Sequence, residues 1–124
     1  MLIYIFPFSK IPKTMLENIG YVVYTLVNEG GLSAIWSYAD DECKLTYGTG
    51  RARLISRGSE LFVGEYTVVY VDQNDKKTEF QLSISLIDEN TYKLEWSIDG
   101  QIALNGIGGV VDYKLSVGWK PADL

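Results

Sequence analysis

The sequence predicts an all-β protein, an antiparallel up-and-down β-barrel of about eight strands preceded by a short N-terminal strand or helical turn. From Gly20 onward, short apolar runs recur about every ten residues with turn-forming residues between them. The clearest runs alternate apolar and polar side chains, as strands with one buried face do. Closure into a barrel follows because it removes both unpaired edges of such a sheet.

A chain of 124 residues with 47% apolar and 22% charged residues is the size and composition of one globular domain. We expect residues 20–124 to form the barrel and residues 1–19 to form an N-terminal extension. Residues 2–6 have strand composition, but Pro7 and Pro12 restrict them to an edge strand or a plug. The spacing of Thr14 and Glu17 is that of a capping box, which predicts a short helix ending near Gly20.

The first half of the barrel is read from four apolar segments separated by turns rich in Asp, Asn and Gly. The predicted strands lie at residues 20–27, 32–38, 52–56 and 61–71. The second half has stronger alternation, in the segments 78–86 and 91–98. Asp99 with Gly100 predicts a two-residue hairpin turn, and Asp112 marks the reversal between the last two strands.

The stretch "NGIGGVVDYKLSVGW" at residues 105–119 has a glycine cluster that is ambiguous between a phosphate-binding loop and a bend in a strand. A phosphate loop opens a helix, whereas strand-like residues follow Gly109 and no Gly-Lys-Ser/Thr sequence appears. We interpret Gly106, Gly108 and Gly109 as the last bend of the barrel. A partial echo of this pattern at residues 48–66 predicts a second, similar hairpin.

The segment "LEWSIDGQIALNGIGGVVDYKLSVGW" at 94–119, together with "GTGRA" at 48–52 and "GEYTVVYVD" at 64–72, resembles small bacterial calycin-like proteins. Their repeats end in Gly-x-Gly followed by Leu-x-Val-Gly-Trp. The resemblance to this lipocalin- and avidin-like architecture implies one antiparallel barrel that holds one small ligand.

The predicted inward face of the barrel is strongly aromatic. A barrel of about eight strands is just wide enough to be filled by its own side chains or to hold one small ligand. The rings therefore form either a packed core or a narrow pocket for a small apolar or aromatic ligand, oriented by tyrosine hydroxyls and indole groups. The candidate lumen residues are Trp36, Tyr38, Tyr66, Tyr70, Phe80, Tyr92, Trp96, Tyr113 and Trp119.

Catalytic chemistry has few candidate residues. The chain has no histidine and a single cysteine, Cys43, whose acidic neighbours disfavour a thiolate. Most Asp residues lie in predicted turns, where they bond backbone amides. We therefore expect no enzymatic activity, no cofactor and no metal site.

The charge distribution argues against nucleic acid as a partner, because the net charge is −5 and the basic residues are scattered. The tightest basic group is Arg51, Arg53 and Arg57, which we read as one solvated strand face, with an anion-binding site as the weaker alternative. Without a basic leader region or a run of about 18 apolar residues, we expect no membrane partner and a cytoplasmic location.

Several apolar residues fall on the predicted outer face and require a cover. Residues 2–8 of the chain or a second subunit are the two candidates, and we favour a homodimer. The proposed contact residues are Ile35, Val63, Val69, Val71 and Ile107. The sequence thus predicts a ligand-binding barrel, with a solid barrel that acts through its outer surface or loops as the alternative.

Overall fold

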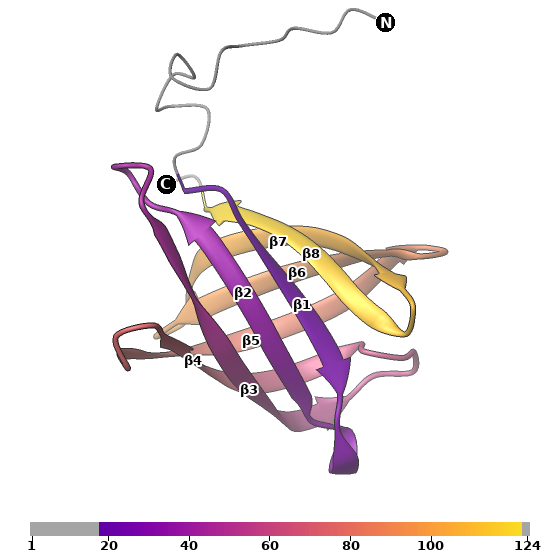
Figure 1. Ribbon diagram of the computed structural model, residues 1–124. Helices are drawn as coiled ribbons and strands as arrows, with labels where there is room; N and C mark the ends of the chain where they lie inside the picture. The colour runs from indigo at the N-terminus through magenta and orange to yellow at the C-terminus, as the bar shows by residue number, and fades with distance from the viewer. Residues whose placement is uncertain (1–17, 123–124) are drawn as a thin grey trace, which may run out of the picture.

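The computed structural model describes residues 18–122, and in this part the chain forms a closed antiparallel barrel whose strands follow one another in sequence order (Figure 1). The predicted fold class is therefore confirmed. The strands are β1 (Gly20–Leu26), β2 (Leu32–Ala39), β3 (Leu45–Arg57), β4 (Gly64–Asp72), β5 (Lys77–Asp88), β6 (Thr91–Ile98), β7 (Gln101–Val111) and β8 (Lys114–Pro121). A short 3-10 turn, η3 (Asn28–Gly30), joins β1 to β2.

Closure comes from β1, which pairs with β2 on one side and with β8 on the other. Gly20 is opposite Tyr38 in the first pairing and opposite Trp119 in the second. All neighbouring strands are antiparallel, and all except β1 and β8 are also consecutive in the sequence. The pairing of the first strand with the last therefore completes the barrel. The strand predicted at residues 20–27 is observed as β1, which begins at Gly20.

The predicted strand positions hold best where alternation is strong, and β3 shows the largest difference. It begins at Leu45, seven residues before the predicted start at 52. Gly48 and Gly50 weaken the strand signal in the sequence, but in the barrel they pair with Asp72 and Tyr70 of β4. Residues 61–63, which were predicted to begin the fourth strand, belong to the β3–β4 turn.

Two hairpin turns have the geometry that the sequence predicts. Asp99 and Gly100 have φ angles of 51° and 79°, and Asp112 and Tyr113 have φ angles of 51° and 65°. Positive φ at both central residues is the mark of a type I′ turn, whose twist matches that of the flanking strands. Both reversals are therefore confirmed.

The glycine cluster of β7 provides space for close neighbours. A Cβ atom at Gly106 would lie 2.8 Å from the Trp96 ring, and one at Gly109 would lie 2.9 Å from the backbone oxygen of Asn90. A Cβ at Gly108 would overlap the backbone oxygen of Ser116. None of the three has a positive φ. The cluster therefore allows β7 to pack tightly against neighbours on both sides, and it opens no helix.

The two ends of the barrel differ. At one end lie the start of β1, the end of β8 and the β2–β3, β4–β5 and β6–β7 connections (Figure 1). At the opposite end the β3–β4 loop folds inward, so that Phe62 is only 3% exposed and joins the core. The largest fully buried side chains are Trp96, Tyr24, Leu32, Leu82, Ile84, Leu94, Leu115, Val22 and Val68.

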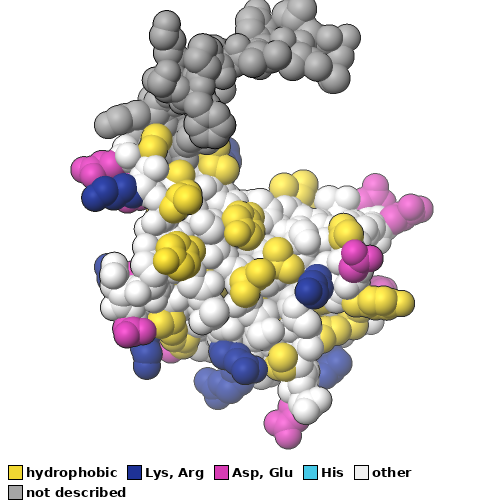
Figure 2. Space-filling view, in the orientation of Figure 1, with side chains coloured by type: hydrophobic (Ala, Val, Ile, Leu, Met, Phe, Trp, Pro, Cys, Tyr) yellow, Lys and Arg dark blue, Asp and Glu magenta, His cyan; other side chains and the backbone are white. Residues whose placement is uncertain are grey.

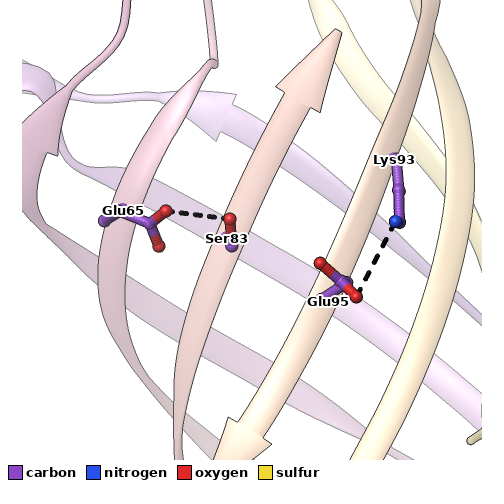
Figure 3. A network of polar contacts seen from close by, with 4 residues as sticks. All are labelled: Glu65, Ser83, Lys93 and Glu95. Carbon is purple, nitrogen blue, oxygen red and sulfur yellow. Dashed lines mark hydrogen bonds and ion pairs between the residues drawn. The ribbon is translucent and has the colours of Figure 1, made fainter. Parts of the chain in front are cut away.

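The outer face of β5 and β6, together with the start of β4, is polar, as the alternation predicted. The Ser83 hydroxyl donates to the Glu65 carboxylate at 2.9 Å, and the Lys93 ammonium lies 3.8 Å from the Glu95 carboxylate (Figure 3). Such exposed contacts contribute at most about 1 kcal/mol each. They identify this as the solvated side of the sheet.

The predicted edge strand or plug at residues 2–6 and the capping box from Thr14 to Glu17 lie outside the described residues. Within residues 18–122, the structure contains no helix long and apolar enough to cross a membrane.

Candidate functional site

An open cavity of about 320 Å³ occupies the end of the barrel where β1 begins and β8 ends. We call this cavity the cup. Every strand supplies at least one of its lining residues, so its shape is fixed by the sheet rather than by a loop. The lining residues are Asn18, Val22, Trp36, Tyr38, Thr46, Tyr70, Asp72, Lys76, Thr78, Phe80, Trp96, Leu104, Trp119 and Pro121.

Part of the wall of the cup is a connected series of aromatic rings. The ring centroids of Tyr38 and Trp119 lie 5.3 Å apart, and those of Trp36 and Tyr38 lie 6.0 Å apart and nearly parallel, at 17°. Tyr70 contacts Trp36 and Phe80 edge-on, with centroids 6.1 and 5.9 Å apart. These separations are typical of favourable aromatic pairs, so the rings support one another around the cavity.

Glycines provide the space for the largest rings. A Cβ atom at Gly50 would lie 2.7 Å from the Tyr70 ring, and one at Gly20 would overlap the Trp119 indole. Together with Gly106 beneath Trp96, these positions let rings lie flat against the opposite backbone. The aromatic wall therefore fits into a barrel of modest width and leaves an opening at its centre.

At the floor of the cup, Tyr70 and Trp96 line the cavity and form a hydrogen-bonded triangle with Tyr24, which lies buried beneath them. The Trp96 indole Nε1 donates to the Tyr70 hydroxyl at 2.7 Å and lies 3.2 Å from the Tyr24 hydroxyl. The hydroxyls of Tyr24 and Tyr70 are themselves joined by a short hydrogen bond. Residues from β1, β4 and β6 thus meet across the lumen, although they are 26 to 72 positions apart in the chain.

Burial raises the pKa of Tyr24 well above its ordinary value, and proximity to Tyr70 raises it further. Burial also raises the pKa of Tyr70, against the opposing effect of its hydrogen bonds from Tyr24 and Trp96. A phenolate in this environment would lose its hydration without gaining a cation. Both hydroxyls therefore remain protonated and able to donate hydrogen bonds at neutral pH.

These shifts predict a loss of stability at alkaline pH. Each folded-state pKa is raised above the unfolded value of about 10, so the stabilisation is complete below that pH and is lost as pH rises above it. We expect the free energy of unfolding to fall by about 1.4 kcal/mol per pH unit for each of Tyr24 and Tyr70. Urea denaturation across this range, followed by circular dichroism, measures the slope. In Tyr70→Phe the slope should be shallower by about 1.4 kcal/mol per pH unit, the contribution of one tyrosine. An unchanged slope would contradict the raised pKa of Tyr70.

The rim of the cup is held by side chains that cap turns. The Asp72 carboxylate accepts hydrogen bonds from the backbone amides of Asn74 and Lys76 at 2.8 and 2.9 Å. The Gln73 amide bridges to β3, accepting from the Tyr47 backbone amide at 3.0 Å and donating to the Leu45 carbonyl at 3.2 Å. The β4–β5 turn is therefore tied to the start of β3, so the opening is preformed.

Six of the nine predicted lumen aromatics line the cup: Trp36, Tyr38, Tyr70, Phe80, Trp96 and Trp119. Tyr66 and Tyr92 are also buried in the lumen but lie toward the closed end, where both contact Phe62. The placement of Tyr113 was wrong, because its side chain is 88% exposed. It occupies the second central position of the β7–β8 turn, so the alternation of β8 starts only after it.

Sequence reasoning missed Tyr24 and the rim residues Thr46 and Lys76. Tyr24 has the same parity as Val22 in the first predicted strand, and this signal was sufficient to place it inward. Thr46 precedes the predicted third strand, which begins only at residue 52, whereas β3 begins at Leu45. Lys76 lies in a turn, and the sequence of a turn does not indicate which end of the barrel it borders.

The three arginines do not share one face. Arg51 and Arg53 point outward from β3 and are exposed, opposite Val69 and Thr67 of β4. A β-bulge between Leu54 and Ser56 reverses the alternation, so Arg57 pairs with Gly64 on the other parity at the end of the strand. The prediction of one shared arginine face is wrong, because a single inserted residue shifts every later side chain to the opposite face.

The outward apolar residues also separate into groups. Ile35 and Ile107 are strongly exposed, whereas Val69 and Val71 are half-buried. Val63 was placed wrongly, since it lies in the β3–β4 turn and packs against the core. Figure 2 shows apolar side chains across the face formed by β1 and β2, with charged side chains mostly at its margins.

The fold and the cup together define the protein as an eight-stranded up-and-down barrel with an aromatic cavity open at one end. No model of a known protein family matches the chain, and neither a curated protein nor a solved structure matches it.

Proposed function

We propose that the protein is a non-enzymatic binding protein that takes a small, flat apolar or aromatic ligand into the cup. The observation that carries this proposal is an open cavity of about 320 Å³ whose lining includes six aromatic side chains. Small-molecule sites usually begin at about 300 Å³ and are lined by apolar and aromatic side chains with a few polar groups. The cup has this size and this composition.

The rings favour a flat guest because a planar molecule can pack against the faces and edges of aromatic side chains. Trp36, Phe80 and Trp119 come from three different strands and all line the cavity that the ligand would enter. Each aromatic pair between ligand and wall contributes about 0.5–1.5 kcal/mol beyond the burial of apolar area. The preformed rim lowers the cost of ordering the site, since little must move on binding.

The cup favours this proposal over a solid barrel that acts only through its outer surface. Side chains fill the lumen at the closed end, but the half bounded by the rim retains an opening. A calycin-like relationship and a cytoplasmic location complete the proposal, supported by the barrel topology and by the single cysteine of the chain.

A matched pair of variants on β7 tests the proposal. Leu104 lines the cup, whereas Ile107 is 60% exposed on the outside of the barrel. Leu104→Trp places an indole into the cavity, and Ile107→Trp adds the same group outside it. We expect Leu104→Trp to weaken naphthalene binding by about tenfold or more, the equivalent of about 1.4 kcal/mol, and Ile107→Trp to leave it unchanged.

Isothermal titration calorimetry gives the affinities, and thermal melts establish that each variant is folded. Tryptophan fluorescence supplies an independent signal, because all three tryptophans of the chain line the cup. Native mass spectrometry of the protein from its host would detect a co-purifying ligand. Equal naphthalene affinity in both folded variants would argue against binding in the cup.

A further inference from the structure

We infer that the ligand carries an uncharged hydrogen-bond acceptor, such as a carbonyl oxygen or a ring nitrogen, at the end that enters the cup first. The donor is the hydroxyl of Tyr70. This inference rests on the proposed function and specifies the chemistry of its ligand. It follows from counting the hydrogens in the triangle at the floor.

The triangle contains three donors but can use only two of them internally. Trp96 has one N–H, and Tyr24 and Tyr70 each have one O–H. The indole nitrogen cannot accept a hydrogen bond, so its hydrogen goes to a tyrosine oxygen. The single contact between the two hydroxyls uses one more hydrogen. One hydroxyl hydrogen must therefore point away from the triangle.

Burial decides which hydroxyl that is. Tyr24 is 0% exposed and does not border the cup, whereas Tyr70 lines it. Within residues 18–122, the Tyr24 hydroxyl has no hydrogen-bond partners other than Tyr70 and Trp96. If Tyr70 donated to Tyr24, the Tyr24 hydrogen would be buried without an acceptor. The alternative, in which Tyr24 donates to Tyr70, frees the Tyr70 hydrogen to donate into the cavity that Tyr70 lines.

The acceptor on the ligand is uncharged because the floor holds no cation. Among the described lining residues, only Asp72 and Lys76 are charged, and both belong to the rim turn at the end of β4. A carboxylate at the level of Tyr70 would lose its hydration for a neutral donor and aromatic rings. A carbonyl or a ring nitrogen loses far less and still satisfies the hydroxyl.

The test compares naphthalene with quinoline, which has nearly the same shape but carries one ring nitrogen. Titration calorimetry at neutral pH gives the ratio of the two affinities. We expect this preference for quinoline over naphthalene to fall by about three- to tenfold in Tyr70→Phe, the range expected for one net hydrogen bond. Tyr66→Phe is the matched control, since it removes a buried hydroxyl that bonds the Phe62 carbonyl away from the cup.

Tyr24→Phe separates the two assignments of the hydrogen. If Tyr70 already donates into the cup, removing the Tyr24 hydroxyl leaves the quinoline preference in place. A preference that first appears in Tyr24→Phe would overturn the assignment, because it would mean that Tyr70 had been donating to Tyr24. The infrared carbonyl stretch of indanone bound to the wild-type protein provides a readout that needs no variant. It should be lowered from its value in hydrocarbon solvent, and an unshifted stretch would overturn the inference.

Failure of the inference and failure of the proposed function are distinguishable. If naphthalene and quinoline both bind and Tyr70→Phe leaves the ratio of their affinities unchanged, the cup binds flat ligands but Tyr70 is not the donor. If naphthalene, quinoline and indanone all fail to bind, the proposed function falls and the inference falls with it.

Discussion

Replacing Trp96 with alanine should lower the free energy of unfolding by about 3–5 kcal/mol, the cost typical of a buried large aromatic side chain. Trp96 is 1% exposed and its ring fills the space above Gly106. Its removal leaves a cavity at the centre of the lumen. It also removes the hydrogen bond of 2.7 Å that the indole Nε1 donates to the Tyr70 hydroxyl. Both effects act on the same residues, so the loss should fall at the upper end of the range.

Trp119→Ala is the matched control for that experiment. Trp119 is also a lumen tryptophan, but it is only partly buried at the mouth of the cup and has no part in the floor triangle. Urea denaturation followed by far-ultraviolet circular dichroism should show a clearly smaller loss for this variant. Trp96→Phe should fall between the two, because it retains a ring but not the donor. Equal losses for Trp96→Ala and Trp119→Ala would contradict the central role of the triangle.

The barrel was predictable from the sequence because alternation and turn chemistry are local signals. The alternation within residues 78–98 predicts a hairpin independently of the rest of the chain, and Asp99 with Gly100 specifies the turn that follows. The early part of β3 was missed for the same reason. Gly48 and Gly50 weaken the local strand propensity. Both positions lack space for a side chain, because the backbone of β4 lies against Gly48 and the Tyr70 ring of β4 lies against Gly50.

The cup was only partly predictable, because its decisive contacts join residues distant in the chain. The parity of each strand placed Trp36, Tyr70 and Trp96 inside, but parity does not give height along the barrel axis. Height depends on the register between strands, which separates the cup residues from Tyr66 and Tyr92 at the closed end. The bulge after Leu54 and the turn position of Tyr113 show how one residue changes a face.

Phe62→Ala should also lower the free energy of unfolding by about 3–5 kcal/mol, since the ring closes the other end of the barrel. Phe62 is 3% exposed, meets the Tyr92 ring edge-on with centroids 6.4 Å apart, and offers its carbonyl to the Tyr66 hydroxyl at 2.9 Å. Its φ of 70° is unusual for a residue with a side chain, and glycine adopts it freely. The packing of the ring therefore maintains a conformation that costs about 1 kcal/mol.

That backbone strain gives the prediction a specific form. Phe62→Gly removes even more of the side chain than Phe62→Ala, yet it should be less destabilising by about 1 kcal/mol because it relieves the left-handed conformation. Leu61→Ala, at the neighbouring position and 54% exposed, should change stability by no more than about 0.5 kcal/mol. Denaturant unfolding of the three variants measures these differences. If Phe62→Gly were the least stable of the three variants, relief of the left-handed backbone would not contribute measurably. The stability of the closed end would then depend on burial of the Phe62 ring alone.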